Sequence, residues 1–212
     1  MPPLALVGAG LTAAGVLALL FAEHAERRAI AWLAKPAAST GFLVAALGVG
    51  AMGSRYGRLV VLALALCWLG DVLLIPAARA AFLAGLGSFL AGHVVLGWAF
   101  VERGVAWPLA ALALAALSLP SLALWRWLSP HLDRGMRGPV VAYLVVIVAM
   151  VSAAAATRAP LVVFGAVAFL VSDLAVARDR FVAPGFVNRA WGLPLYYAAV
   201  LALAWSASTE GA

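Results

Sequence analysis

The chain has 212 residues, of which 67% are hydrophobic and only 10% are charged. Soluble domains are usually about a quarter charged, so this chain has too little polar surface to coat a globule in water. Its apolar runs approach the roughly 20 residues that a helix needs to cross the hydrocarbon core of a bilayer. They do not alternate apolar and polar residues as the strands of a membrane β-barrel must, so we expect helices to make the crossings.

The single cysteine and the positive charge exclude further classes of protein. Cys67 lies in an apolar run without a second cysteine, so it forms neither an internal disulfide nor a cysteine metal site. The net charge of +6 comes from basic residues between apolar runs, which membrane topology explains better than nucleic-acid binding does. Residues 4–22 have the length of a signal peptide but lack a basic leading segment, so we interpret them as a retained first helix.

Charged and Pro/Gly-rich segments divide the sequence into eight predicted transmembrane helices. They span residues 4–22, 30–50, 58–76, 80–101, 105–127, 138–156, 160–178 and 189–207. No connection is long enough for a second domain. We therefore expect one all-α, polytopic transmembrane domain over residues 1–212.

Basic residues are shared unevenly between the two sides of the predicted bundle. Ten lie in or beside the connections after the first, third, fifth and seventh helices: Arg27, Arg28, Lys35, Arg79, Arg126, Arg134, Arg137, Arg178, Arg180 and Arg189. Four lie on the opposite side: Arg55, Arg58, Arg103 and Arg158. The positive-inside rule makes the first side cytoplasmic, so both termini should face outward, in what we expect to be a bacterial inner membrane.

The two halves of the chain carry a weak internal similarity. Residues 60–71 (VVLALALCWLGD) align without a gap with residues 162–173 (VVFGAVAFLVSD), matching at two valines and the aspartate. The segments belong to the third and seventh predicted helices, which run in the same direction. A parallel duplication of a four-helix unit would explain the match, although three identities among apolar residues prove little.

Asp71 and Asp173 are the two acidic residues inside apolar spans, each near the predicted cytoplasmic end of its helix. A charged side chain costs roughly 2.5 to 3.5 kcal/mol at the centre of a membrane helix, so such residues usually face the bundle interior and serve function. The alternative is an acid that reaches toward water or pairs with a loop arginine. Two aspartates at matched depth favour the functional interpretation.

Further polar side chains are predicted at a similar depth: Lys35, Ser39, Tyr143, Tyr196 and Tyr197. At ~1.5 Å per residue they fall within one layer roughly 5 to 12 Å below the cytoplasmic interface, where a polar cavity could open. Taken singly, the lysine and the tyrosines are also ordinary interfacial anchors. Because they converge with the aspartates, we predict that they bind the substrate.

His93 lies near the middle of the fourth predicted helix, deeper than the aspartates in this arrangement. A lone intramembrane histidine is more often an interhelical hydrogen-bonding residue than a ligand, and no second histidine lies at metal spacing. We include His93 among the candidate substrate-binding residues. We expect no metal and no other cofactor.

Six short motifs occur in a characteristic order along nearly the whole chain. They are Lys35-Pro36, Leu69-Gly70-Asp71, residues 82–93 ending in Phe89-Leu90-Ala91-Gly92-His93, Tyr143 with Met150, Ser172-Asp173, and Tyr196-Tyr197. This order resembles the YhhN-like lysoplasmalogenase family of multi-pass membrane enzymes. Two features depart from the family pattern, namely Cys67-Trp68 before Leu-Gly-Asp and the early arginine Arg178 after Asp173. Neither removes a carboxylate.

The resemblance implies hydrolysis of the vinyl ether bond of lysoplasmalogens to a fatty aldehyde and glycerophosphoethanolamine or glycerophosphocholine. It also implies that Asp71 and Asp173 are catalytic. Vinyl ethers hydrolyse through protonation of the β-carbon, so one carboxyl must be neutral to donate a proton while the other, ionised, steadies the cation and orients water. The sequence leaves open which aspartate is the acid. Lys35 and nearby loop arginines would hold the phosphate of a lysophospholipid at the bilayer interface.

Other functions use similar residues. Buried Asp, Lys and His also build ion paths, so a small-molecule or proton-coupled transporter is the main alternative, and broken helices would favour it. Intramembrane aspartyl proteases also use two aspartates, but they resemble a Gly-x-Gly-Asp pattern in which Trp68 occupies the first glycine position here. A non-catalytic membrane scaffold is the remaining interpretation.

Overall fold

The computed structural model describes residues 2–208, and these form eight long helices without a strand. The helices are α1 (Pro3–His24), α2 (Arg28–Gly48), α3 (Arg55–Leu73), α4 (Arg79–Arg103), α5 (Trp107–Leu128), α6 (Arg134–Ala156), α7 (Pro160–Ala177) and α8 (Phe186–Ser206). Three short helical turns accompany them: η1 (Ala51–Gly53), η2 (Ser129–His131) and the π-helical turn η3 (Arg178–Val182). The eight predicted helices are confirmed.

The outer surface of the bundle is suited to lipid. Seven of the eight helices, α1 to α7, are long and apolar enough to cross a membrane. Large apolar side chains are exposed on them, including Leu17 at 69%, Leu33 at 78% and Leu119 at 76% exposure. Water would penalise such a surface, whereas lipid tails accept it. The protein is an integral membrane protein with a helical bundle, as the composition predicted.

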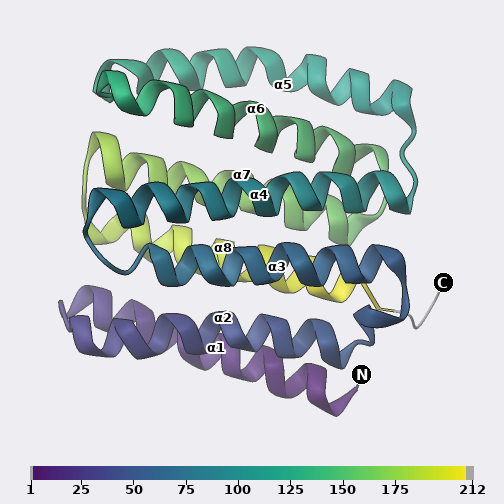
Figure 1. Ribbon diagram of the computed structural model, residues 1–212, viewed down its shortest axis with the longest axis horizontal. Coiled ribbons are helices and arrows are strands. Elements are labelled where there is room, and N and C mark those ends of the chain that lie inside the picture. Colours follow the sequence, from purple (N-terminus) through teal and green to yellow (C-terminus); the bar gives the residue numbers. More distant parts are fainter. Residues whose placement is uncertain (1, 209–212) are drawn as a thin grey trace.

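Consecutive helices pair into four antiparallel hairpins. Figure 1 shows the α1/α2 hairpin at one edge of the bundle and the α5/α6 hairpin at the other, with α3 and α4 in front of α7 and α8 between them. Helix α4 also packs on α6, and α8 packs on α2. These two contacts would be equivalent if the two halves of the chain were repeats, so the packing has the form that a duplication would give.

The α1/α2 hairpin is held together by small residues. A Cβ atom on Gly8 would lie 2.3 Å from the backbone nitrogen of Ala45, and one on Gly41 would lie 2.4 Å from Thr12 Oγ1. Glycine therefore permits the two backbones to touch, as in other membrane helix pairs. Thr12 Oγ1 donates a hydrogen bond to the carbonyl oxygen of Ala38 at 3.0 Å, which ties the hairpin at its centre.

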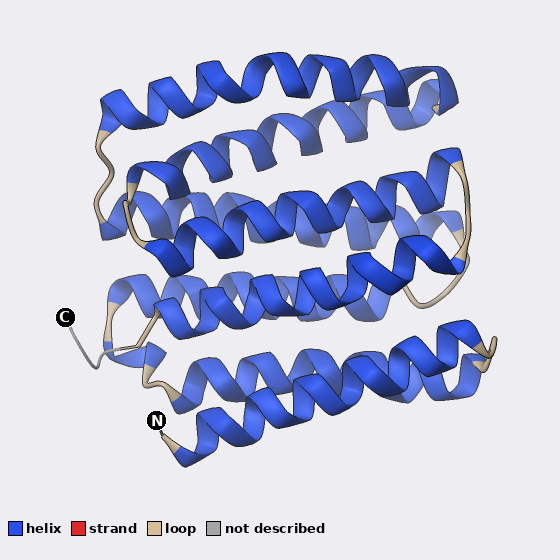
Figure 2. Cartoon of the chain, turned by 180° about the vertical axis from the view of Figure 1, so that it is seen from behind, coloured by secondary structure: helices blue, strands red, loops and turns tan. Residues whose placement is uncertain are grey.

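The end of the bundle that carries both chain termini is closed by polar contacts (Figure 2). Tyr56 and Ser206 share a hydrogen bond of 2.6 Å between their hydroxyls. Arg103 donates to the carbonyl oxygen of Ser206 at 3.1 Å and lies over the ring of Tyr56. These contacts join α3, α4 and α8. We call the opposite end, where the α1–α2, α3–α4, α5–α6 and α7–α8 connections lie, the mouth end.

Helix boundaries differ from prediction where capping side chains act. Helix α6 begins at Arg134 instead of residue 138, because the side chain of Asp133 accepts a hydrogen bond from the backbone N–H of Met136 and caps the helix. Helix α3 begins at Arg55, because the side chain of Ser54 accepts a hydrogen bond from the backbone N–H of Gly57 and caps the helix. Helix α7 continues through η3 to Val182, which places Asp173 farther from the mouth end than its predicted boundary implied.

Candidate active site

Asp71, near the end of α3, is a buried carboxylate with three polar partners. Ser39 Oγ donates to its Oδ2 atom at 2.6 Å, and the Tyr196 hydroxyl donates to the same oxygen at 2.7 Å. Lys35 Nζ lies 3.5 Å from the other oxygen, Oδ1. The Asp71 side chain is only 3% exposed, so these donors take the place of water around it.

The partners of Asp71 come from two helices. Lys35 and Ser39 are four residues apart on α2, and therefore on one face of that helix. Tyr196 and Tyr197 are on α8. The only proton of the Ser39 hydroxyl goes to Asp71, so Tyr197 is the donor toward Ser39 Oγ at 3.2 Å, and the same hydroxyl lies 3.5 Å from the carbonyl oxygen of Lys35, a second acceptor. Tyr197 thus orients Ser39 and acts on the Asp71 carboxylate through it.

Asp173, on α7, has a different set of partners. The Tyr143 hydroxyl of α6 donates to its Oδ2 atom at 2.8 Å. His93 Nε2 of α4 lies 3.7 Å from the same oxygen, beyond ordinary hydrogen-bond distance. Within residues 2–208, no lysine or arginine pairs with Asp173. Its side chain is 19% exposed, which makes it the more accessible of the two carboxyls.

The His93 ring has a defined orientation. Its Nδ1 atom lies 2.7 Å from the carbonyl oxygen of Phe89, which can only accept, so Nδ1 carries a proton. Nε2 is buried and has no hydrogen-bond partner in the described chain. In a neutral ring Nε2 would present a lone pair toward Asp173. The sequence placed His93 deeper than the aspartates, but α7 extends through η3, so Asp173 lies level with the histidine.

Aromatic rings link the side chains that contact the two carboxyls. The ring centroids of Phe169 and His93 are 4.4 Å apart, and those of Phe169 and Tyr196 are 5.3 Å apart. Phe89 packs edge-on against both Phe169 and Tyr196. A Cβ atom on Gly70 would lie 2.6 Å from the Phe89 ring, which explains why a glycine precedes Asp71. The wall of rings fixes the side chains that hold each carboxyl.

Both carboxyls line one cavity of about 1080 Å³ that reaches the mouth end. Lys35, Tyr143 and Tyr196 also line it. Ser39, His93 and Tyr197 are not among the lining residues and lie behind the carboxyls. Part of the cavity wall is apolar and comes from α4, α5 and α6: Leu86, Leu124, Trp125, Leu128, Val140, Leu144 and Ile147.

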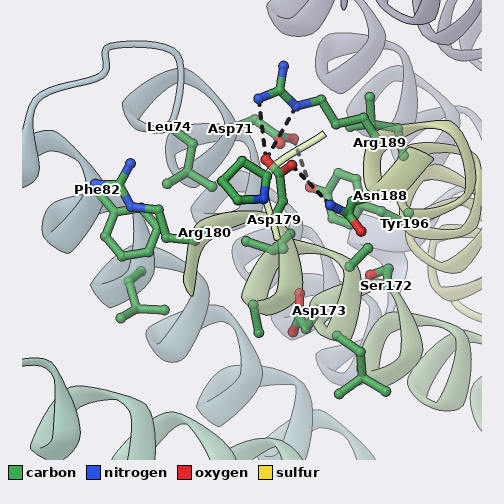
Figure 3. A pocket seen from close by; sticks show the side chains of 18 of the residues that line it. Asp71, Leu74, Phe82, Ser172, Asp173, Asp179, Arg180, Asn188, Arg189 and Tyr196 are labelled. Atoms are coloured by element: carbon green, nitrogen blue, oxygen red, sulfur yellow. Dashed lines mark hydrogen bonds and ion pairs between the residues drawn. The ribbon is translucent and has the colours of Figure 1, made fainter. Parts of the chain in front are cut away.

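A polar network borders the cavity at the mouth end. Arg189 of α8 pairs with Glu23 at the end of α1 and with Asp179 in η3, the latter at 3.3 Å. Asn188 donates to Asp179 Oδ1 at 3.2 Å and accepts from Arg178. Figure 3 shows Asp179, Asn188 and Arg189 together, with Asp71 and Tyr196 behind them.

Sequence reasoning brought together the eight candidate residues but missed two groups. The rings of Phe89 and Phe169 gave no signal beyond apolar packing. The mouth network was missed because the sequence shows the loop arginines as topology signals and possible phosphate ligands, but not which of them pair with Glu23 and Asp179. Within the described residues, no three side chains of His, Cys, Asp or Glu gather as a metal site would require.

The fold and the cavity define a polytopic helical membrane protein with two enclosed carboxyls and an opening that is polar on one side and apolar on another. A model of the YhhN family matches residues 30–207. The chain therefore belongs to the YhhN family, and the predicted membership is confirmed. No curated protein and no solved structure matches it.

Proposed function

We propose that this protein is a lysoplasmalogenase, a hydrolase that cleaves the vinyl ether bond of a lysoplasmalogen to a fatty aldehyde and a glycerophospho-alcohol. Membership of the YhhN family supports the proposal. The observation that carries it is the pair Asp71 and Asp173, which line one amphipathic cavity in unlike electrostatic surroundings. A lipid substrate needs a polar and an apolar part of the same cavity, and acid hydrolysis needs two carboxyls in different states.

The contacts favour Asp71 as the ionised member of the pair. It has an ammonium group at 3.5 Å and two hydroxyl donors on one oxygen, which is the environment that a buried carboxylate requires. Lys35 was expected to bind phosphate. Its contact with Asp71 favours a role in holding that carboxylate instead.

The contacts favour Asp173 as the proton donor. It accepts one hydrogen bond from a hydroxyl, forms no ion pair with a lysine or arginine of the described chain, and has the Nε2 atom of His93 nearby. An ionised Asp173 would face the lone pair of a neutral histidine, and this contact is repulsive. We therefore expect one proton between the Asp173 carboxyl and His93 Nε2, in addition to the proton on Nδ1. That proton is then available to a substrate, because Asp173 is the more exposed carboxyl.

The reaction can be written with these two groups. Asp173 transfers its proton to the β-carbon of the vinyl ether, and the α-carbon becomes part of an oxocarbenium ion. Asp71, as carboxylate, stabilises that cation and accepts a proton from the attacking water, which forms a hemiacetal. The hemiacetal hydroxyl then gives its proton to Asp173 as the bond from the former α-carbon to the glycerol oxygen breaks, and the glycerol oxygen takes the proton that Asp71 accepted from water. One water is consumed, and both aspartates return to their starting states.

We further propose that the mouth end faces the cytoplasm of a bacterial cell and that the protein lies in its inner membrane. Most basic residues of the chain lie in or beside the mouth-end connections, as the positive-inside rule requires of a cytoplasmic face. The ends of the described chain lie at the opposite end of the bundle and would face outward (Figure 1). Cysteine accessibility labelling in whole cells, with single cysteines in the α3–α4 and α6–α7 connections, tests this orientation.

The function is tested by incubating the detergent-purified protein with a lysoplasmalogen and, in parallel, with its saturated ether analogue. We expect aldehyde from the vinyl ether alone, since only the unsaturated carbon accepts a proton to form the oxocarbenium ion. Undiminished aldehyde release from a folded Asp71→Asn/Asp173→Asn double variant would show that the two aspartates do not carry the reaction. A pure, folded protein that releases no aldehyde from any lysoplasmalogen chain length would refute the proposal and leave transport as the function to test.

A further inference from the structure

The arginines at the mouth end differ in whether they already have an anionic partner. Arg189 lies between Glu23 and Asp179, and Arg178 donates to the side chain of Asn188. Arg180 also lines the cavity, but no carboxylate of residues 2–208 pairs with it. Its guanidinium carbon lies 4.4 Å from the centroid of the Phe82 ring.

The π-helical turn η3 separates Arg180 from its neighbours. The turn is closed by a hydrogen bond of 2.8 Å from the N–H of Ala183 to the carbonyl oxygen of Arg178. Within it, Asp179 points to the α8 side of the mouth and Arg180 points to Phe82 on α4, as Figure 3 shows. Such turns occur frequently at functional sites, because the extra residue redirects side chains.

From this geometry we infer that Arg180, stacked on Phe82, binds the phosphate of a single-chain phospholipid whose hydrocarbon chain occupies the apolar part of the cavity. The inference rests on the proposed function, for which it names a specificity-determining residue. The Phe82 ring covers one face of the guanidinium and leaves the N–H groups at its edge free for a phosphate. Planar guanidinium donors match phosphate oxygens in pairs.

Existing contacts at the mouth support Arg180 over the other cations that line the cavity. Arg28 of α2 also lines it without a carboxylate partner in residues 2–208, but no aromatic ring of the described chain is stacked on its guanidinium. Arg189 already pairs with two carboxylates, Glu23 and Asp179, and Lys35 is engaged with Asp71. A phosphate placed at Arg180 therefore displaces no existing ion pair. A phosphate at Arg189 or Lys35 would have to compete with carboxylates that are already there.

The position along the helix also suits a glycerophospholipid. Arg180 follows Asp173 by about two helical turns, or roughly 10 Å along the axis. An extended glycerol backbone separates the sn-1 vinyl ether from the sn-3 phosphate by a comparable span. A phosphate held at Arg180 would thus place the vinyl ether near Asp173, and the attached chain would continue between α4, α5 and α6.

The first test compares two substrates in the wild-type protein and in Arg180→Gln, Arg180→Lys and Arg137→Gln variants. Arg137 is exposed near the same end and does not line the cavity, so its substitution makes the same charge change outside the proposed site. For a lysoplasmalogen, Arg180→Gln should raise KM about tenfold or more and leave kcat within about twofold. Arg180→Lys should be intermediate, and Arg137→Gln should resemble the wild type.

The second substrate is a monoalkenylglycerol, which has the vinyl ether but no phosphate. Its KM should be the same in the wild-type and Arg180→Gln proteins, because the group that Arg180 contacts is absent. An equal rise in KM for both substrates would show that Arg180 acts on packing or on membrane placement, and would overturn the inference. So would an unchanged KM for the lysoplasmalogen.

A binding experiment separates this inference from the proposed function. An ester-linked lysophosphatidylcholine has the phosphate but no vinyl ether, so its stabilisation of the purified protein against heat reports binding without turnover. Loss of that stabilisation in Arg180→Gln, with no loss for 1-acylglycerol, supports the phosphate site even if the protein releases no aldehyde. Equal, Arg180-dependent stabilisation by inorganic phosphate alone would assign the site to a free anion and overturn the lipid assignment.

Discussion

Asp71 and Asp173 occupy corresponding places in the two halves of the molecule and yet lie in opposite electrostatic surroundings. Each accepts a hydrogen bond from a hydroxyl on the second helix of its own half, that of Ser39 at a separation of 32 residues and that of Tyr143 at 30. Each also meets one side chain from the fourth helix of the other half, Tyr196 on α8 or His93 on α4. This pairing is what a parallel duplication would give.

The two carboxyls differ in two neighbours: Asp71 has the ammonium group of Lys35, and Asp173 has the imidazole ring of His93. Lys35 approaches Asp71, and no lysine or arginine of the described chain approaches Asp173. The place that Tyr196 takes beside Asp71 is taken beside Asp173 by His93, whose Nε2 atom has no hydrogen-bond partner. A nearly symmetric scaffold can therefore supply an acid and a base from two identical side chains, provided that their neighbours differ.

The largest expected effect is that of Asp173→Asn. An amide cannot donate the proton that starts the reaction, so kcat for aldehyde release should fall by about 10³-fold or more. Folding should survive, because asparagine keeps the volume and removes an ionisable group from a membrane interior. Steady-state aldehyde release measures the effect, and the elution profile and thermal stability check the fold.

Asp133→Asn is the matched control for this variant. Asp133 is an exposed acid near the mouth end that pairs with Arg79 and does not line the cavity. Its substitution should leave turnover unchanged. If Asp173→Asn is folded and retains wild-type turnover, Asp173 is not the acid.

Asp71→Asn should follow, with a fall in kcat of about 10²-fold, because the oxocarbenium ion loses the negative charge that stabilises it. Chemical rescue distinguishes the two roles. Added formate should restore part of the turnover of Asp71→Ala as an anion, whereas Asp173→Ala should respond only where the added acid is protonated. The opposite pattern of rescue would exchange the two assignments.

The sequence predicted the depth of these residues in the membrane but not which of their side chains face one another. Depth in the membrane follows from counting residues along a helix, so Asp71, Asp173 and the tyrosines could be assigned to one layer. Rotation of each helix about its axis does not follow from depth, because apolar side chains face both lipid and neighbouring helices. The pairing of Lys35 with Asp71, and of His93 with Asp173, therefore required the packed bundle.

Elsewhere, the prediction failed at helix ends. The extension of α7 through η3 could not be anticipated, because Arg178, Asp179 and Arg180 read as an ordinary charged connection. Yet this extension brings Asp173 level with His93 and places Arg180 at the cavity. The charged residues that ended the predicted helix are the ones that build the mouth.

Lys35→Met tests the cation that separates the two halves. If Lys35 only held the phosphate, KM would rise and kcat would change little. Because its ammonium lies 3.5 Å from Asp71, we expect kcat to fall about tenfold, the equivalent of roughly one charge-assisted hydrogen bond. Separate measurement of kcat and KM for aldehyde release decides between the two roles. A rise in KM alone would return Lys35 to the role of phosphate ligand and leave Asp71 without its positioning cation.

His93→Phe should have the smallest effect and locates the proton within the second half. Phenylalanine preserves the ring contact with Phe169 and removes Nε2, which lies 3.7 Å from Asp173 Oδ2. If the transferable proton lies on Asp173, the carboxyl keeps it without the histidine, and Tyr143 still orients the acid, so kcat should fall only about threefold. If the proton lies on His93 and the pair is an ion pair, phenylalanine leaves a buried carboxylate without its counter-charge, and kcat should fall nearly as far as in Asp173→Asn.

An infrared spectrum of the resting protein checks the same point, since the band of a protonated carboxylic acid should be present in the wild type, persist in His93→Phe and disappear in Asp173→Asn. A wild-type spectrum without that band would place the proton on the histidine and make His93 the acid of the pair.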